Sequence, residues 1–316
     1  MVFHYPTLLP TFVSLNLQFM KNILTFFFCL SISFITVAQD DLMNELDKEI
    51  KPTTNYTTAT FKSTRIINGH SNETIAAKHM DFRISHRFGA LNSGYKELFG
   101  LDVAKVRIGF EYGITNDLMV GVGRSGYQKT YDYFVKYKLL KQSSGKRNMP
   151  VSVSLFANAA TNTLDTSPDM QFLNNMERQT YCTQVLIARK FSDDLSIQIT
   201  PTFLHRNKVE IAGDPNSLMV LGMGGRTKLT KRTSLNVEYW LVPQARTANY
   251  TNCLSLGFDI ETGGHVFQLH LSNSRGMVEN QFIGQTTGRW TSGDIFYGFN
   301  ISRTFSFDRA ARNIHK

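Results

Sequence analysis

The end of the chain carries a two-residue alternation that only an extended strand can use. In residues 293–307 (GDIFYGFNISRTFSF), apolar side chains fill alternate positions from Ile295 to Phe307, with Arg303 as the exception, while Gly298, Asn300 and similar small or polar residues lie between them. Successive side chains of a β-strand point to opposite faces, so the segment has one apolar and one polar face. Such a strand suits a barrel wall that meets lipid outside and encloses a polar interior.

The same alternation recurs along the chain. Residues 105–113, for example, set Val106, Ile108 and Phe110 against Arg107 and Glu111. We predict twelve strands, at residues 79–88, 105–113, 118–125, 130–140, 151–162, 178–191, 195–207, 218–229, 234–241, 252–261, 265–273 and 294–307. Most have about the nine to eleven residues that a tilted strand needs to cross a bilayer. The fold class expected is therefore all-β, a single antiparallel transmembrane β-barrel.

The links between these segments are alternately short and long, as in barrels with short periplasmic turns and longer external loops. Short links fall at residues 114–117, 192–194, 230–233 and 262–264, with a polar turn of moderate length at 141–150. Longer ones fall at 89–104, 163–177, 208–217, 242–251 and 274–293. The tight 126–129 link is the exception. Twelve strands satisfy the even-number rule. We therefore place the weakly strand-like residues 57–67 outside the wall, either in the periplasm or in the lumen.

The beginning of the chain has the pattern of an export signal. Met20 and Lys21 precede the apolar residues 23–37, and Ala38 lies at the small-residue position of a cleavage site. We expect residues 1–19 to reflect a start assigned too early, 20–38 to be a signal peptide, 39–56 a periplasmic lead-in, 57–307 the barrel and 308–316 a polar tail. A membrane anchor, or a lipoprotein modified at Cys29, are the alternatives. Elsewhere no run of eighteen apolar residues occurs, so helical spans are excluded there.

The charge and the cysteine content limit the classes of partner, metal and cofactor that we expect. Removing residues 1–38 takes away one Lys from 34 basic residues and leaves 33 against 25 acidic ones, a net charge of +8. This excess suits an anionic membrane surface or an anionic solute, but it forms no nucleic-acid patch. Cys182 and Cys253 lie in predicted strands, and there is no CxxC pair or His/Cys cluster, so we predict no metal and no cofactor.

The polar faces of the predicted strands carry charges that must be paired or hydrated, because an unpaired buried ion costs several kcal/mol. These candidate lumen-lining residues are Arg83, Arg87, Arg107, Glu111, Asp132, Lys136, Lys138, Glu238 and Asp259. They could line a selective path for a small polar or ionic solute. They could equally form a structural network inside a closed barrel, because twelve strands leave a narrow lumen once side chains enter it.

An enzyme is the less favoured interpretation. His86, His270 and Ser255 lie at predicted inward or edge positions, but there is no GxSxG, no HExxH and no close Ser/His/Asp group. We therefore predict no catalytic residues. The glycines of residues 219–225 are expected to ease strand curvature or to make room for a neighbour in the lumen, since no helix follows them as in a phosphate loop.

Aromatic residues occur mainly near predicted strand ends, where the girdles of membrane barrels lie. They are Tyr127, Tyr131, Tyr133, Tyr239, Trp240, Trp290, Phe296 and Tyr297.

Residues 81–89 (DFRISHRFG) and 293–305 are similar to a family of Gram-negative outer-membrane β-barrels known as a domain of unknown function. The resemblance covers residues 56–307. It implies an outer-membrane barrel and gives no catalytic residue. The sequence departs from such barrels at residues 308–316 (DRAARNIHK), which follow Phe307, where assembly signals usually finish on an aromatic residue.

Together these observations favour a non-enzymatic outer-membrane barrel that acts as a narrow channel, a small-solute binder or a structural component of the envelope. Its expected partners are outer-membrane lipid, the outer-membrane assembly machinery and a small polar or anionic solute. The alternatives are an outer-membrane enzyme of the lipid hydrolase or acyltransferase type, and a secreted soluble β-sandwich.

Overall fold

The computed structural model describes residues 53–166, 172–244, 246, 250–262 and 265–307. The expected early start, the signal peptide, residues 39–52 of the lead-in and the tail at residues 308–316 lie outside the described residues.

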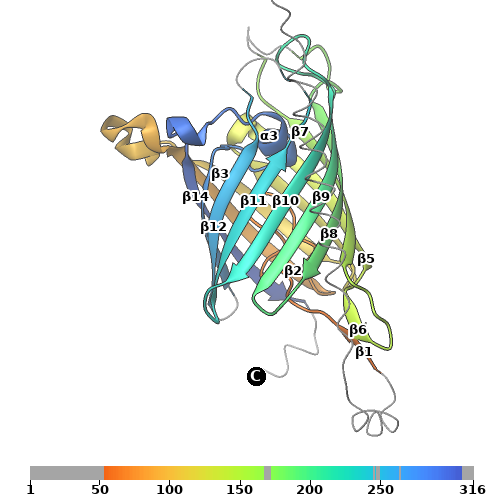
Figure 1. Ribbon diagram of the computed structural model, residues 1–316. Helices are drawn as coiled ribbons and strands as arrows, with labels where there is room; N and C mark the ends of the chain where they lie inside the picture. The colour runs from red at the N-terminus through yellow and green to blue at the C-terminus, as the bar shows by residue number, and fades with distance from the viewer. Residues whose placement is uncertain (1–52, 167–171, 245, 247–249, 263–264, 308–316) are drawn as a thin grey trace, which may run out of the picture. The chain divides into compact units, whose positions relative to one another are not determined.

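Twelve antiparallel strands form a closed barrel, in which β14 pairs with β2 (Figure 1). The strands are β2 (His79–Ala90), β3 (Lys105–Gly113), β4 (Leu118–Ser125), β5 (Thr130–Leu140), β7 (Ser152–Asn162), β8 (Gln179–Lys190), β9 (Leu195–Arg206), β10 (Ser217–Lys228), β11 (Thr233–Leu241), β12 (Cys253–Thr262), β13 (His265–Ser272) and β14 (Phe296–Ser306). The predicted fold class and strand number are confirmed, with strand ends shifted by no more than two residues.

Closure satisfies the backbone hydrogen bonds of every strand, which lipid cannot do. Burial alternates along the strands as the sequence predicts. Phe110 and Val122 are paired neighbours on β3 and β4 and both face outward, whereas Arg107 and Glu111 face inward and are buried. Arg303, the outward exception, packs its guanidinium 5.1 Å from the ring centre of Phe305.

The two ends of the barrel differ. Short turns lie at the end where β2 begins and β14 finishes, which the rule of short inner turns assigns to the periplasm. A two-stranded sheet of β1 (Thr54–Tyr56) and β6 (Ser143–Gly145), which the sequence did not predict, lies beyond this end (Figure 1).

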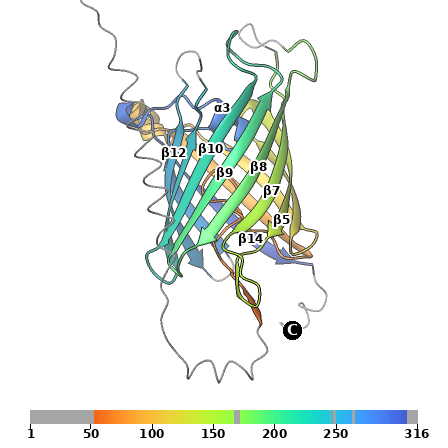
Figure 2. The ribbon, with the colours of Figure 1, turned by 45° about the vertical axis from the view of Figure 1, so that its right-hand side comes forward.

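The longer links and the tight 126–129 link lie at the outer end and contain several short helices (Figure 2). These are η1 (Leu91–Ser93), η2 (Tyr95–Gly100), η3 (Tyr127–Lys129), α3 (Glu279–Gly284) and η4 (Trp290–Ser292). Within the described ranges, no helix has the length and apolar character to cross a membrane.

Residues 57–78, hereafter the plug, enter and leave the barrel at its periplasmic end, and their middle part lies inside the barrel rather than in its wall. They form no strand, and the only regular feature is a hairpin in which Arg65 bridges His70 and the Ile66 N–H donates to the Gly69 carbonyl at 2.9 Å. Most side chains from Thr60 to Asn72 are buried. We expected residues 57–67 either in the periplasm or in the lumen, and the structure places most of them in the lumen.

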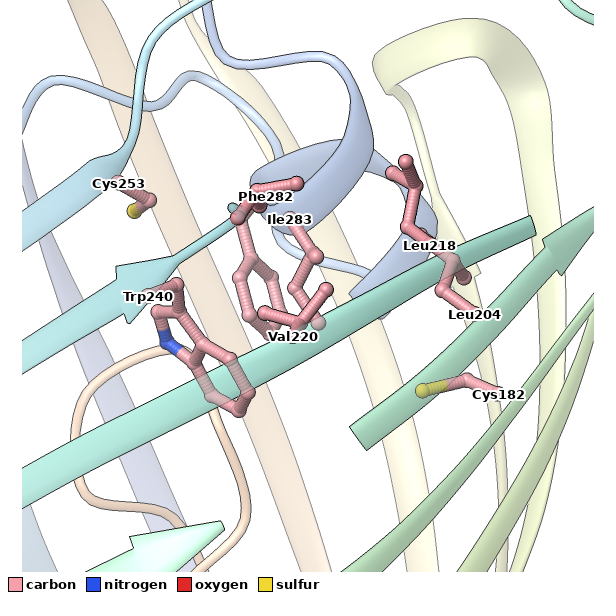
Figure 3. Close-up of a cluster of buried hydrophobic side chains, with 9 residues drawn as sticks. Cys182, Leu204, Leu218, Val220, Trp240, Cys253, Phe282 and Ile283 are labelled. Atoms are coloured by element: carbon pink, nitrogen blue, oxygen red, sulfur yellow. The ribbon is translucent and has the colours of Figure 1, made fainter. Parts of the chain in front are cut away.

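The helix α3 closes the outer end of the lumen through an apolar cluster. Phe282 and Ile283 are fully buried against inward side chains of β8 to β12 (Figure 3). Trp240 belongs to this cluster, with its ring centre 5.2 Å from that of Phe282, so its expected place in an outer aromatic girdle is wrong.

Glycines in the 219–225 run make room for lumen neighbours. A Cβ at Gly222 would lie 2.6 Å from the Trp240 ring, and one at Gly224 would lie 2.3 Å from Ile66 of the plug. The prediction that these glycines accommodate a neighbour in the lumen is confirmed.

The orientation of the wall gives a depth-dependent prediction. Val122→Lys puts a charge on the lipid face near the middle of β4 and is expected to lower the free energy of unfolding by about 2–4 kcal/mol. The matched control is Leu118→Lys at the periplasmic end of the same face, with an expected loss of about 0–1 kcal/mol. Denaturant titration in detergent or vesicles measures both, and equal losses would contradict a lipid-facing wall.

Candidate functional site: the plugged lumen

The tip of the plug is held by a carboxylate on the barrel wall. Glu238 of β11 accepts hydrogen bonds from the backbone N–H groups of Ile67, Asn68 and Gly69, at 3.1, 3.1 and 2.9 Å, and from the indole N–H of Trp240 at 2.8 Å. The turn gathers three N–H groups on one side, and the carboxylate satisfies them. Gly69 is required here, since a Cβ would lie 2.4 Å from the Trp240 ring.

A lysine on the opposite wall binds the backbone on both sides of this tip. The Lys136 ammonium donates to the carbonyl of Ser71 at 3.0 Å, to that of Thr64 at 3.3 Å and to Nδ1 of His70 at 3.4 Å. Burial and the nearby cations Arg65 and Lys136 hold the pKa of His70 well below its ordinary value, so the ring is neutral and its Nδ1 can accept a hydrogen bond. The His70 ring also packs between Phe134 and Phe156.

Residues 63 and 64, which precede the tip of the plug, contact charged side chains of β2 and β3. Glu111 accepts a hydrogen bond from the Thr64 hydroxyl at 2.6 Å, and Arg83 donates to the hydroxyls of Ser63 and Thr64 at 2.9 Å each. Arg83 also lies 3.2 Å from Asp81 and 3.8 Å from Glu111. The wall charges are thus paired with one another and with the plug at the same time.

Arg65 joins the plug to two separate parts of the barrel. Its guanidinium lies 3.9 Å from Glu111 on the wall and 3.6 Å from Glu279 of α3. His70 Nε2 lies 3.8 Å from the same Glu279 carboxylate. Burial raises the pKa of Glu279, and Arg65 counters that rise. The inner hairpin and the outer helix therefore meet at one buried carboxylate.

Two further predicted residues reach the plug. Arg87 donates to the Asn68 side chain, and the Asn68 amide in turn donates to Ser255 at 2.9 Å. Lys138 lies 3.6 Å from Glu73 where the plug leaves the lumen.

The remaining three predicted residues have wall partners. Arg107 and Asp132 form a two-contact ion pair across β3 and β5, with the Arg107 Nε 2.9 Å from Asp132. Glycines at 109 and 123 leave space for this arginine, since a Cβ at either would lie within 2.7 Å of its guanidinium. Asp259 accepts from Gln268 at 2.9 Å.

Sequence reasoning missed the amides and the loop carboxylate of the site. Gln268 donates to the Ile66 carbonyl at 3.1 Å, Asn300 donates to the Ile67 carbonyl at 3.2 Å, and Glu279 lies in a predicted loop. Gln268 and Asn300 are inward positions of regular strands, so the alternation places them in the lumen. Their partners are set by the plug, which has no alternation of its own.

The three enzyme candidates do not come together. His86 faces outward and stacks on Phe299 with ring centres 4.9 Å apart, so its expected inward or edge position is wrong. The Ser255 hydroxyl donates to Ser272 at 2.8 Å, and neither ring nitrogen of the buried His270 has a hydrogen-bond partner among the described residues. A nucleophile needs a base within hydrogen-bond reach, and in the described part of the chain these residues form no such pair. The described residues also contain no group of three or more His, Cys, Asp or Glu side chains placed to hold a metal ion.

A closed barrel with an apolar outer face and a lumen filled by its own chain defines a membrane-bound β-barrel of the outer-membrane type. Residues 61–305 match the family described as "Membrane bound beta barrel domain (DUF5777)", and the chain belongs to this family. The resemblance noted in the sequence and the outer-membrane location are thereby confirmed. No curated protein sequence matches the chain.

Solved structures of similar fold include both channels and an enzyme. The KdgM porin is 11% identical with a TM-score of 0.42, covering 73% of this chain and 99% of that one. The NanC porin is 10% identical with a TM-score of 0.46, covering 72% and 100%. Outer membrane phospholipase A from Escherichia coli is 9% identical with a TM-score of 0.40, covering 71% and 89%. At this level of identity the similarity concerns the fold alone.

The carboxylate that holds the plug tip gives a testable prediction. Glu238→Ala leaves three N–H groups of the turn without acceptors, so the free energy that keeps the hairpin in place is expected to fall by about 1–3 kcal/mol. Hydrogen–deuterium exchange of peptides covering residues 64–72 measures this fall. The control is Glu261→Ala, which removes a more exposed partner of Lys62 and is expected to cost less than about 1 kcal/mol. Unchanged exchange in Glu238→Ala would contradict the anchoring role.

Proposed function

We propose that the protein is a non-enzymatic gated channel of the outer membrane, closed in this conformation by the plug and by α3. The observation that supports this proposal is that six of the nine predicted lumen residues, Arg83, Arg87, Glu111, Lys136, Lys138 and Glu238, bind the plug through polar contacts.

A polar interface is not the most stable way to close a lumen permanently. Replacing buried ion pairs by well-packed apolar residues is often neutral or stabilises a protein by about 1–4 kcal/mol. A lumen that only had to be filled could therefore be apolar. Charged residues such as Glu238 and Lys136, by contrast, can exchange their hydrogen bonds to the plug for hydrogen bonds to water. The plug also buries Phe61, Ile66 and Ile67, so its departure exposes some apolar surface. The charged lining that remains suits water and small solutes.

Arg65 is the residue that we propose holds the closed state. It pairs with Glu279 of α3, beside the His70 ring, and it also lies near Glu111 of the wall. A movement of either the plug or α3 separates an ion pair that is almost fully buried. Opening at one end of the lumen is thus coupled to the other end.

The solute that we propose is small and polar or anionic. Five of the nine predicted lumen residues are basic, Arg83, Arg87, Arg107, Lys136 and Lys138, and the mature chain carries a net positive charge. Outer-membrane lipid and the assembly machinery remain proposed partners, because a barrel of this kind must be inserted into a bilayer.

Conductance tests the gate. In planar bilayers the wild-type chain is expected to be silent or to open rarely. Arg65→Glu places a third carboxylate beside Glu111 and Glu279, and breaking a buried pair costs about 3–5 kcal/mol. The ratio of open to closed states is therefore expected to rise by about two orders of magnitude or more. If Arg65→Glu inserts, folds and stays silent, the protein is a structural barrel or a binder rather than a channel.

A covalent lock provides the control for that experiment. Asn68→Cys introduces a thiol near Cys253, whose sulfur lies 3.8 Å from the Asn68 amide nitrogen. In Arg65→Glu/Asn68→Cys, oxidation is expected to abolish the current and reduction to restore it, with the linked peptide identified by mass spectrometry. A current that persists in the linked protein would mean that ions pass elsewhere than through the plug's position.

The non-enzymatic part of the proposal has its own test. Purified protein is expected to show neither lipid hydrolysis nor acyl transfer, because Ser255 and His270 lack the geometry of a nucleophile and its base. Activity in the wild type that disappears in His270→Ala or Ser255→Ala, while both variants remain folded, would support the enzyme alternative instead.

A further inference from the structure

The link between β2 and β3 extends sideways from the barrel. Residues 91–104, hereafter the side loop, include η1 and η2 and lie beside the outer ends of the strands rather than over the mouth (Figures 1 and 2). The Leu91 N–H donates to the Ile295 carbonyl at 2.9 Å, and the Asn92 amide donates to Ser292 at 3.1 Å. The side loop is thus fixed to the rim at its base.

The side loop exposes large apolar side chains. Tyr95 is 76% exposed, Leu98 53% and Phe99 54%, and Leu91 and Leu101 are exposed as well. Contiguous exposed apolar residues of this kind mark interaction surfaces. Most other exposed apolar residues of the molecule belong to the outer face of the strands, which contacts the lipid of the bilayer.

The backbone holds these side chains outward at a conformational cost. Leu98 and Phe99 have φ angles of 44° and 53°, in the left-handed region that residues other than glycine rarely adopt. Gly100 follows with φ 91°, and a Cβ there would lie 2.5 Å from the backbone of Gly89. Strained residues persist only where the surrounding structure fixes them. The tight contact of the two glycines supplies that constraint.

The surface below the side loop is continuous with the lipid-facing wall. Phe88 and Tyr297, at the outer ends of β2 and β14, stack with ring centres 4.6 Å apart. Tyr95 adds an amphipathic ring and Lys96 a cation in the link that follows the outer end of β2. Tyrosine and lysine are the residues that anchor membrane proteins at the interface of acyl chains and headgroups.

We propose that the side loop is a membrane anchor, in which Tyr95, Leu98 and Phe99 insert into the boundary of headgroups and acyl chains in the outer leaflet. The occupant of this surface is lipid. The anchor fixes the rim beside β2 and β14 to the bilayer, and it does not depend on whether the barrel conducts.

Depth-dependent fluorescence quenching tests the anchor. The full chain contains only Trp240 and Trp290, so the emission added by Phe99→Trp is obtained by subtracting the wild-type spectrum. In vesicles of phosphatidylcholine with brominated acyl chains, this added emission is expected to be blue-shifted and mostly quenched, and aqueous iodide is expected to leave it unchanged. Tyr95→Trp is a second reporter should Phe99→Trp fail to fold.

A matched control lies at the same end of the barrel. Leu173 is 83% exposed in the link between β7 and β8, and Leu173→Trp is expected to be quenched by iodide and not by brominated lipid. Iodide quenching of Phe99→Trp to the same extent would overturn the proposal. So would protection from both quenchers that appears only at high protein density, since the surface would then contact a second copy of the chain.

Discussion

A closed sheet of twelve strands encloses more space than its own inward side chains can fill, and this constraint governs the rest of the structure. About eight strands make a barrel whose interior side chains just fill. Lipid forces the sheet to close, because an open edge would leave backbone groups without partners. The remaining volume must hold water or protein. Here the plug enters from one end and α3 from the other, and both are bound by residues on the inner face.

The two fillings differ in chemistry. At the outer end, Phe282 and Ile283 of α3 pack on apolar wall residues. Deeper in the lumen, the plug is held mainly by Glu238, Lys136 and Arg83 through hydrogen bonds and ion pairs, with a smaller apolar contribution from Ile66 and Ile67. Removal of an apolar filling costs about 25 cal/mol for each Å² exposed to water. The free-energy cost of removing a polar filling is offset in part, because water hydrates both of the polar surfaces that separate.

The wall could be predicted from sequence because its two faces contact environments of opposite polarity. Lipid outside and a polar lumen inside impose a period of two on residues such as Phe110 and Glu111, and that period is local. The same alternation placed the nine charged residues on the inner face. The plug could not be predicted in this way, because its backbone is shaped by wall residues more than a hundred positions away, as with Asn68 and Glu238. Trp240 is a different case: the alternation that places Glu238 on the inner face also places Trp240 there, but its position near a strand end suggested a girdle.

The contrast between the two fillings also indicates which of them moves. If α3 left first, Phe282, Ile283 and the wall residues beneath them would lose their apolar contacts, and Arg65 would keep only Glu111 as a charged partner. If the plug left first, Arg65 would carry its own charge out to water, and Glu111 would keep Arg83 at 3.8 Å. Glu279 would lose its charged partner on the plug. In the proposed gating, these differences make the plug the mobile element and α3 the fixed element against which it closes.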